Sequence, residues 1–294
     1  MFGYQAGDAL TTGNNNIAIG SNTLGADTLG DRSVAIGNEA LASQNFTSST
    51  DNYNVAVGYQ AGAAVTTGIQ NTLIGGQAGD SLTDADFNVA IGTTALASDT
   101  LGSRSIAIGR RTLMAQNFTS ATDTYNVAIG FEAGNDVTTG TNNTLVGGLA
   151  GDAITTGSAN TSVGTGSLGS NTTASSNTAV GFDAGSSNTT GAFNTFVGKD
   201  SGLSITTTSN STFVGEYSGR STTGGGNTFI GQGAGTAVTS GGNNTILGQY
   251  TGNQGGLDIR TSSNNIVLSD GDGNPRVIVD SDGIILINKT GAIS

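Results

Sequence analysis

The chain has 294 residues, of which 49 are glycine and only 10% are charged, and its formal net charge is −12. That acidity argues against nucleic acid as a partner, and no apolar run is long enough to predict membrane insertion. The absence of Cys and His removes disulfides, thiolate metal sites and the commonest general base, so we expect no cofactor, no metal site and no enzymatic activity.

One phrase recurs along the whole chain: an Asn or Ser, a hydrophobic triplet, and a glycine. The first copy is already incomplete at Met1, so we expect the chain to be part of a longer protein. Most intervals between closing glycines are 17 residues, and a fixed period of this length is typical of a solenoid. The sequence therefore predicts an all-β parallel β-roll, or β-solenoid, with about 15 rungs. The closing glycines are Gly3, Gly20, Gly37, Gly58, Gly75, Gly92, Gly109, Gly130, Gly147, Gly164, Gly181, Gly198, Gly215, Gly231 and Gly248.

The hydrophobic triplet predicts a short strand whose first and third side chains share one face, because strand side chains alternate. The third position is aliphatic in every copy, from Ile19 to Leu247, and the first is Val, Ile or Thr, as in Ile17 and Thr245. β-branched side chains suit a pleated strand. We interpret this face as the interior of the coil.

The middle residue of the triplet then points outward. It is mostly Ala in the early copies and Phe in several late ones. Such a column would be a large exposed apolar patch in a single chain, so we expect other copies of the chain to cover it. The alternative is that a terminal or looped segment covers the column. The candidate interface residues are Leu73, Leu145, Phe196, Phe213, Phe229 and Ile246.

The polar residue that opens each phrase predicts a structural ladder. Short polar side chains bond turn backbone locally, and stacked Asn side chains can bond along a coil axis. A row of ligand-binding Asn side chains is the alternative. The ladder residues are Asn16, Ser33, Asn54, Asn71, Asn88, Ser105, Asn126, Asn143, Asn160, Asn177, Asn194, Ser211, Asn227 and Asn244.

The second half of each repeat predicts a second short strand, around aliphatic residues such as Val65 and Val137, before Thr-Thr-Gly closes the unit. Two intervals are 21 residues because they carry related inserts, 44–53 and 116–125, which we expect to bulge as surface loops. Aromatic residues in these inserts are candidates for receptor contact, and so are the aromatic residues that directly follow the closing glycines Gly58 and Gly130. Equally, they could clamp the loops onto the roll or be ordinary surface variation. The candidates are Phe46, Tyr53, Tyr59, Phe118, Tyr125 and Phe131.

The C-terminal part departs from the repeat, so we divide the chain into a repeat shaft, 1–252, and a segment 253–294. Turn residues between apolar runs predict a β-meander in that segment, which forms a cap or the start of a next fibre segment. Asp270, Asp272 and Asn274 resemble the opening of a calcium loop. The bidentate Glu that such a loop requires is missing, which favours a hairpin turn.

The repeated phrase with its Thr-Thr-Gly spacers, as at 11–13 and 66–68, resembles the repeat region of bacteriophage tail fibres. The segments 265–276 and 279–283 are similar to the region that precedes the C-terminal intramolecular chaperone domain of those fibres. The copies 33–37 and 105–109 also resemble the head repeats of trimeric autotransporter adhesins. Both families are homotrimers. The resemblance implies a homotrimer in an extracellular virion tail fibre or, alternatively, on a bacterial cell surface.

These observations favour a structural and adhesive role, a homotrimeric tail fibre shaft that presents surfaces for host attachment. Its expected partners are copies of the chain, other virion tail proteins and a host cell-surface receptor or glycan. The alternative is a bacterial trimeric autotransporter-type adhesin head. A glycan-degrading tailspike is a weaker alternative, because glycoside hydrolysis needs a unique pair of carboxylates, whereas many acids here step with the repeat, as Asp8, Asp80 and Asp152 do. Ice or crystal binding by threonine rows is a further alternative.

Overall fold

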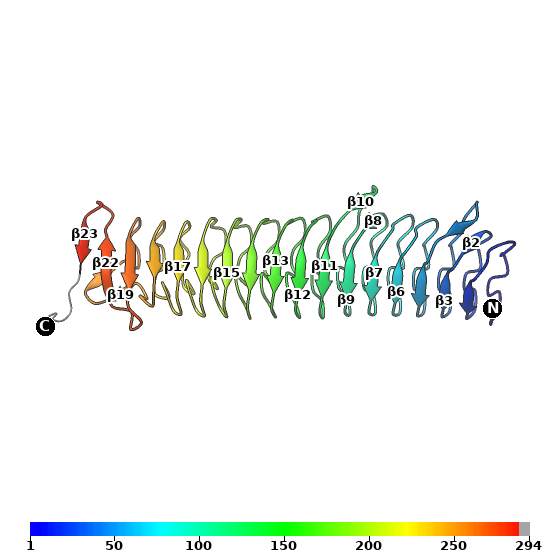
Figure 1. Cartoon of the computed structure of the whole chain (residues 1–294), viewed down its shortest axis with the longest axis horizontal. Coiled ribbons are helices and arrows are strands. Elements are labelled where there is room, and N and C mark those ends of the chain that lie inside the picture. Colours follow the sequence, from blue (N-terminus) through cyan, green and yellow to red (C-terminus); the bar gives the residue numbers. More distant parts are fainter. Residues whose placement is uncertain (288–294) are drawn as a thin grey trace. The chain divides into compact units, whose positions relative to one another are not determined.

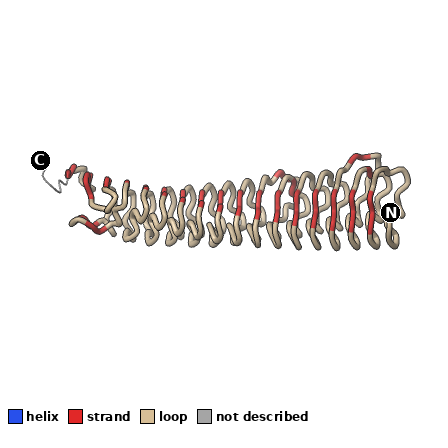
Figure 2. Tube along the Cα trace, turned by 60° about the horizontal axis from the view of Figure 1, so that its bottom comes forward, coloured by secondary structure: helices blue, strands red, loops and turns tan. Residues whose placement is uncertain are grey.

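The computed structural model describes residues 1–287, which contain strands and turns and no helix. It divides into two units, Met1–Gly157 and Ser158–Ser294. Each unit is a parallel β-solenoid in which successive strands stack side by side (Figures 1 and 2). The prediction of an all-β parallel solenoid with about 15 rungs is thereby confirmed.

The first unit contains eight three-residue strands that pair in parallel, one from each rung. The register follows the repeat, so that Val34, Ala35 and Ile36 lie beside Val55, Ala56 and Val57. The strands are β1 (Ile17–Ile19), β3 (Val34–Ile36), β5 (Val55–Val57), β6 (Thr72–Ile74), β7 (Val89–Ile91), β9 (Ile106–Ile108), β11 (Val127–Ile129) and β12 (Thr144–Val146).

The second unit repeats this arrangement and then changes direction. Its parallel strands are β13 (Thr161–Val163), β14 (Thr178–Val180), β15 (Thr195–Val197), β16 (Thr212–Val214), β17 (Thr228–Ile230), β18 (Thr245–Leu247) and β21 (Ile266–Ser269). β22 (Pro275–Val279) and β23 (Ile285–Ile287) then follow in antiparallel order, and β19 (Asn253–Gln254) pairs with β20 (Leu257–Asp258). The end of the expected meander, 288–294, lies outside the described residues.

The second half of each ordinary rung consists of turns, so the expected second strand is wrong. Extra strands occur beside the two inserts, where β2 (Gly30–Asp31) pairs with β4 (Thr50–Asp51) and β8 (Gly102–Ser103) pairs with β10 (Thr122–Asp123). The reason is the density of turns. Residues such as Gln60, Gly62 and Gln70 have positive φ within one rung, and the chain between them bends too often to extend.

The closing glycine of each rung is required by the next rung. Gly58 has φ +142°, and a Cβ on it would lie 2.4 Å from the carbonyl oxygen of Gly75. The same close approach recurs along the column, for example between Gly181 and Gly198. A side chain at this position would push two rungs apart, which explains why the glycine ends every phrase.

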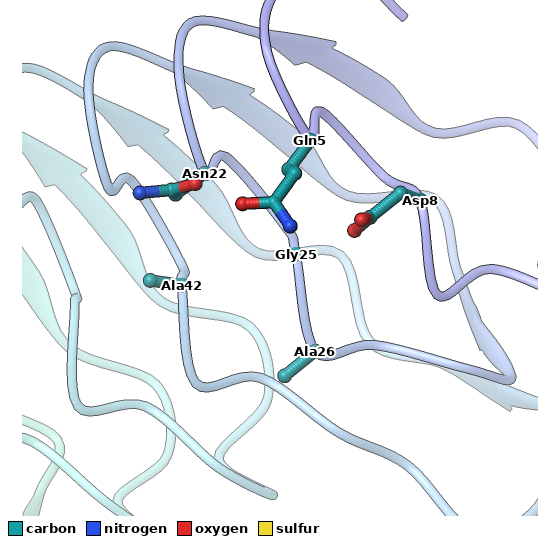
Figure 3. Close-up of a pocket in the computed structure, with 6 residues that line it drawn as sticks. All are labelled: Gln5, Asp8, Asn22, Gly25, Ala26 and Ala42. Atoms are coloured by element: carbon teal, nitrogen blue, oxygen red, sulfur yellow. The ribbon is translucent and has the colours of Figure 1, made fainter.

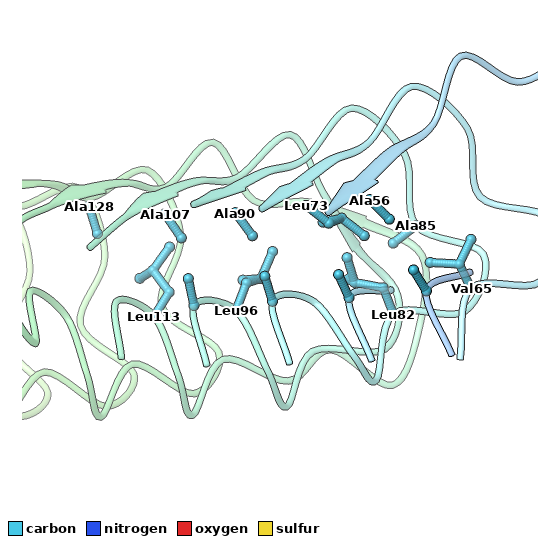
Figure 4. Close-up of a cluster of buried hydrophobic side chains, with 14 of the residues drawn as sticks. Ala56, Val65, Leu73, Leu82, Ala85, Ala90, Leu96, Ala107, Leu113 and Ala128 are labelled. Carbon is cyan, nitrogen blue, oxygen red and sulfur yellow. The ribbon is translucent and has the colours of Figure 1, made fainter. Parts of the chain in front are cut away.

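The expected orientation of the strand faces is wrong. The middle residue of each triplet points into the coil of its own chain, as Figure 4 shows for Ala56, Leu73 and Ala90, and the first and third residues face outward. The alternation itself holds, but β-branched side chains are found on the outside of this sheet and the variable middle residue on the inside. The expected interface residues Leu73, Leu145, Phe196, Phe213, Phe229 and Ile246 are therefore buried within one chain and cannot contact another copy.

Strand and turn residues fill the coil interior together. In some rungs whose strand contributes Ala, such as those of Ala35 and Ala107, a Leu four residues after the closing glycine is buried, as Leu41 and Leu113 are. In the rungs of Ala56 and Ala128 that turn position is glycine, and a Val three residues further along is buried instead. Where the strand contributes a larger side chain, that turn position is glycine. A Cβ on Gly202 would lie 2.3 Å from the Phe196 ring. Because interiors are close-packed, strand and turn side chains compensate for each other in size.

Candidate functional site

The outward face of the strands forms a continuous apolar surface in each unit, which we name the outer stripe. It consists of the first and third residues of the triplets, which are half-buried or exposed. Ile17 and Ile19 at the start of the first unit expose 47% and 42% of their surface. In the first unit both positions are Val or Ile in β1, β3, β5, β7, β9 and β11. In the second unit the first position of β13 to β18 is Thr and the third is Val, Ile or Leu.

The outer stripe is extensive for a surface patch. Rungs about 4.8 Å apart with strands about 10 Å long present on the order of 50 Å² each, so the stripe of each unit presents roughly 350–400 Å². Scattered apolar residues on a protein surface need no explanation, whereas contiguous patches of this size mark interaction sites. Sequence reasoning placed these residues inside the coil and so missed the stripe.

The Asn ladder lies along the inside of the coil, and its side chains bond mainly to backbone groups. The Asn54 Oδ1 accepts a hydrogen bond from the Asn71 backbone N at 2.9 Å, and Asn71 Oδ1 accepts from the Asn88 N at 3.0 Å. The side-chain amide of Asn71 donates to the Ala85 carbonyl at 2.7 Å. These side chains thus join neighbouring rungs, and their polar atoms have no free direction toward a ligand.

Two ladder positions near the inserts are serine, and each belongs to a buried polar cluster. In the first, Gln44 donates from Nε2 to Asp27 at 2.7 Å and to Ser33 Oγ at 2.8 Å. Asp27 also accepts the backbone N–H groups of Gly30 and Phe46 at 3.1 and 3.2 Å. The second insert repeats the arrangement with Asp99, Gln116 and Ser105. These clusters anchor the inserts to the coil.

Two of the expected receptor contacts are wrong. Phe46 and Phe118 expose only 5% and 8% of their surface, and the backbone N–H of each donates a hydrogen bond to the buried Asp27 or Asp99. The aromatic side chains of the inserts therefore fall into two groups. The buried Phe of each insert holds the loop to the coil, and the Tyr at the end of the insert is exposed to solvent. The remaining candidates Tyr53, Tyr59, Tyr125 and Phe131 are each more than half exposed.

Figure 3 shows an open hollow near the start of the first unit. Of its lining residues only Asp8 is titratable, whereas general acid–base hydrolysis of a glycoside needs a pair of carboxylates. Within the described range, acidic side chains form no group of three that could hold a metal ion. The hollow is lined by Gln5, Asp8, Asn22, Gly25, Ala26 and Ala42.

The Asp270 turn joins β21 to β22. Its carboxylate accepts the Asn274 backbone N–H at 2.8 Å, the Asp272 N–H at 3.1 Å and the Arg276 Nε–H at 2.9 Å. The Asn274 N–H first, and then the side chains of Arg276 and Asn274, lower the pKa of Asp270 to about 2. The carboxylate is therefore occupied by a turn and a guanidinium, an arrangement typical of a hairpin.

Comparison of the chain with protein families, curated proteins and solved structures found no match. No membrane-spanning helix is present among the residues that the structure describes.

Proposed function

We propose that the chain is the shaft of a homotrimeric, extracellular fibre, with the outer stripe as the seam between its copies. The observation that carries this proposal is the stripe itself, a row of outward aliphatic side chains along each unit. The stripes of the two units add up to roughly 700 Å² per copy, which compares with about 800 Å² per partner in a standard interface. The number three comes from the resemblance of the repeat to tail fibres and autotransporter heads.

A second copy of the chain matches the stripe best because its period is the same. A partner must present apolar groups every rung, about 4.8 Å apart, in order to pack along the stripe without gaps. An identical solenoid has that spacing in both units. A globular partner would cover a few rungs and leave the rest exposed.

The C-terminal meander extends the stripe. The pairing register places Leu268, Val277 and Ile287 in one outward column, beside the column of Ile266, Val279 and Ile285. β23 is exposed along its whole length, unlike the strands before it. We propose that the meander caps the shaft, with β23 covered by the meanders of the other copies.

The proposed fibre is non-catalytic and belongs to a virion tail, where it meets other tail proteins and a host cell-surface receptor or glycan. A bacterial surface adhesin is the alternative location. Incubating host surface polysaccharide with the chain and measuring new reducing ends tests the tailspike alternative, for which we expect no release.

The seam is tested by introducing charged side chains into the outer stripe while the residues inside the coil are left unchanged. Ile91→Glu with Ile108→Glu places two carboxylates per copy in the seam, where burial of unpaired charge is costly. The control, Thr12→Glu with Thr139→Glu, adds the same charges at exposed positions away from the stripe. We expect the stripe variant to have the mass of a single chain by light scattering, with an unchanged circular dichroism spectrum, and the control to stay trimeric. Two trimeric variants would contradict the seam.

One observation favours a second candidate function. In the second unit Thr161, Thr178, Thr195, Thr212, Thr228 and Thr245 form an unbroken outward row on the sheet, next to a row of aliphatic side chains. An ice-binding face needs such a flat, regular threonine array. A chain that is monomeric and produces thermal hysteresis would favour this function over the fibre, and a trimer without hysteresis would exclude it.

A further inference from the structure

A second surface feature runs along the first unit, on the corner that precedes the outer stripe. One residue from each of six successive rungs projects there, and we name this set the edge row. All six have positive φ, between +50° and +63°, although none is glycine. The edge row consists of Arg32, Tyr53, Gln70, Phe87, Arg104 and Tyr125, all of them exposed.

Backbone hydrogen bonds hold the edge row in register. The N–H of Gln70 donates to the Asn52 carbonyl at 2.7 Å, and the N–H of Phe87 donates to the Ile69 carbonyl at 3.1 Å. Each bond reaches the residue before the preceding member of the row, so neighbouring members lie one rung apart. Six rungs at about 4.8 Å make a row about 24 Å long.

The side chains of the row are fixed by one another. The Arg104 guanidinium lies over the Phe87 ring at 4.8 Å, and its Nη1 is 2.6 Å from Asp123 Oδ1. Tyr125 donates from its hydroxyl to Asp123 Oδ2 at 3.4 Å. In the other insert copy, Arg32 lies over the Tyr53 ring at 5.6 Å and pairs with Asp51. The planar aromatic and guanidinium groups are thus already ordered before binding, so that little side-chain conformational entropy is lost when a ligand binds.

The shape of the row indicates a linear partner. It is one side chain wide and about 24 Å long, whereas a stable contact with a globular protein buries about 800 Å² on each side.

The charges of the row indicate an uncharged partner. Both guanidinium groups are already paired with carboxylates, and the chain as a whole carries a net charge of −12. An anionic polymer would find no unpaired cation in the row. Aromatic rings stack on the C–H faces of sugar rings, and the paired Arg, Asp and Gln groups retain donors and acceptors for hydroxyls.

We propose that the edge row binds a neutral, unbranched polysaccharide, laid along the rungs with sugar rings on Tyr53, Phe87 and Tyr125. This proposal rests on the proposed function, because it supplies the ligand class for host attachment by the fibre. It also assigns a site on the first unit that is separate from the outer stripe.

The test is affinity electrophoresis of the full chain in native gels that contain pullulan, glucomannan or mixed-linkage β-glucan, which are neutral and essentially unbranched, with alginate as the acidic comparison. We expect at least one neutral polysaccharide to retard the wild-type chain and alginate to leave it unaffected. Phe87→Ala with Tyr125→Ala should weaken the retardation at least tenfold. Phe193→Ala is the matched control, since Phe193 has the same backbone conformation at φ +60° but lies between the rungs of Ser176 and Asn210.

Equal retardation of the wild type and the Phe87/Tyr125 variant would overturn the proposal, as would retardation by alginate alone or by none of the neutral polysaccharides. Light scattering on the same samples separates the two levels of inference. If the chain is a trimer and binds no neutral polysaccharide, the edge-row proposal is wrong and the fibre proposal stands. If the chain is a monomer and binds through Phe87 and Tyr125, the trimer is wrong and the edge-row site stands.

Discussion

The two units of the chain fill the same coil with different side chains. The first unit combines small strand residues such as Ala35 with a turn Leu such as Leu41, and the second stacks Phe196, Phe213 and Phe229 against glycine turns. The ring centroids of Phe213 and Phe229 are 5.0 Å apart. The comparison teaches that a large strand side chain requires glycine in the turn, whereas a small strand side chain leaves room that a turn Leu can fill.

The largest expected effect comes from removing one ring of the Phe stack. Phe213→Ala leaves a cavity and loses ring contacts on both sides, which should cost about 3–5 kcal/mol of unfolding free energy. Leu73→Ala in the first unit removes a smaller side chain and no ring contact, so it should cost less than Phe213→Ala, within the range of about 2–5 kcal/mol for a buried Leu. Urea unfolding followed by circular dichroism measures both. A larger loss for Leu73→Ala would show that the Phe stack contributes nothing beyond burial.

A pair of substitutions in the second unit tests whether strand and turn compensate. Gly235→Leu alone should be strongly destabilising, because its Cβ would lie 2.3 Å from the Phe229 ring. Adding Phe229→Ala converts this rung to the arrangement of the first unit. We expect the double variant to be more stable than the sum of the two single changes by about 1–3 kcal/mol. Strict additivity in a double-mutant cycle would contradict the compensation.

The buried clusters of the first unit have a weaker counterpart in the second. Asp99 accepts hydrogen bonds from the Gly102 N–H, the Phe118 N–H and Gln116 Nε2, whereas Asn171 accepts one from the Ala174 N–H. Asp99→Ala should cost about 1–3 kcal/mol because it leaves buried donors unpaired. Asn171→Ala should cost less. Hydrogen exchange should show faster exchange of the Phe118 amide in the first variant, and unchanged exchange there would contradict the anchoring role.

The smallest expected effects concern pH, and they differ in sign between Asp270 in the second unit and the pair Asp80 and Asp152 in the first. Hydrogen bonds lower the pKa of Asp270 to about 2 from its ordinary value of 3.8, so its contribution is present above pH 3.8 and is lost as pH falls toward 2. Burial raises the pKa of Asp80 and Asp152, so stability falls as pH rises from 3.8 through their raised values.

Urea midpoints measured at several pH values test both signs. Asp270→Asn should be less stable than wild type at pH 6 and equal to it near pH 2. Asp80→Asn with Asp152→Asn should be more stable than wild type at pH 6. The opposite order in either comparison would contradict the assigned cause of the pKa shift.

The sequence predicted the period, the strand positions and the Asn ladder, because these depend on spacing alone. Alternation showed that Ile17 and Ile19 share a face, but it could not show which face is inside, since β-branched residues satisfy either. The pairing of large strand residues with turn glycines, as for Phe196 and Gly202, is the signal that distinguishes them. Only a residue that must compensate in size with a turn can be inside the coil.

Two other features depended on information that residue types do not carry. The positive φ of Phe87 could not be foreseen from its own residue type, because this conformation is typical of Gly and Asn. The signal in the sequence is the Asn that occupies the same column in other rungs, at Asn15, Asn142, Asn210, Asn243 and Asn264. Phe46 was assigned to the surface because inserts usually lie there. The buried Asp27 that holds its N–H was not recognised as an anchor.

The mass of the full chain in solution tests the central claim most directly, because the outer stripe must be covered by copies of the chain. Sedimentation equilibrium or light scattering should give three times the chain mass of 28.9 kDa. A stable species of 28.9 kDa, with the stripe exposed to solvent, would contradict the account.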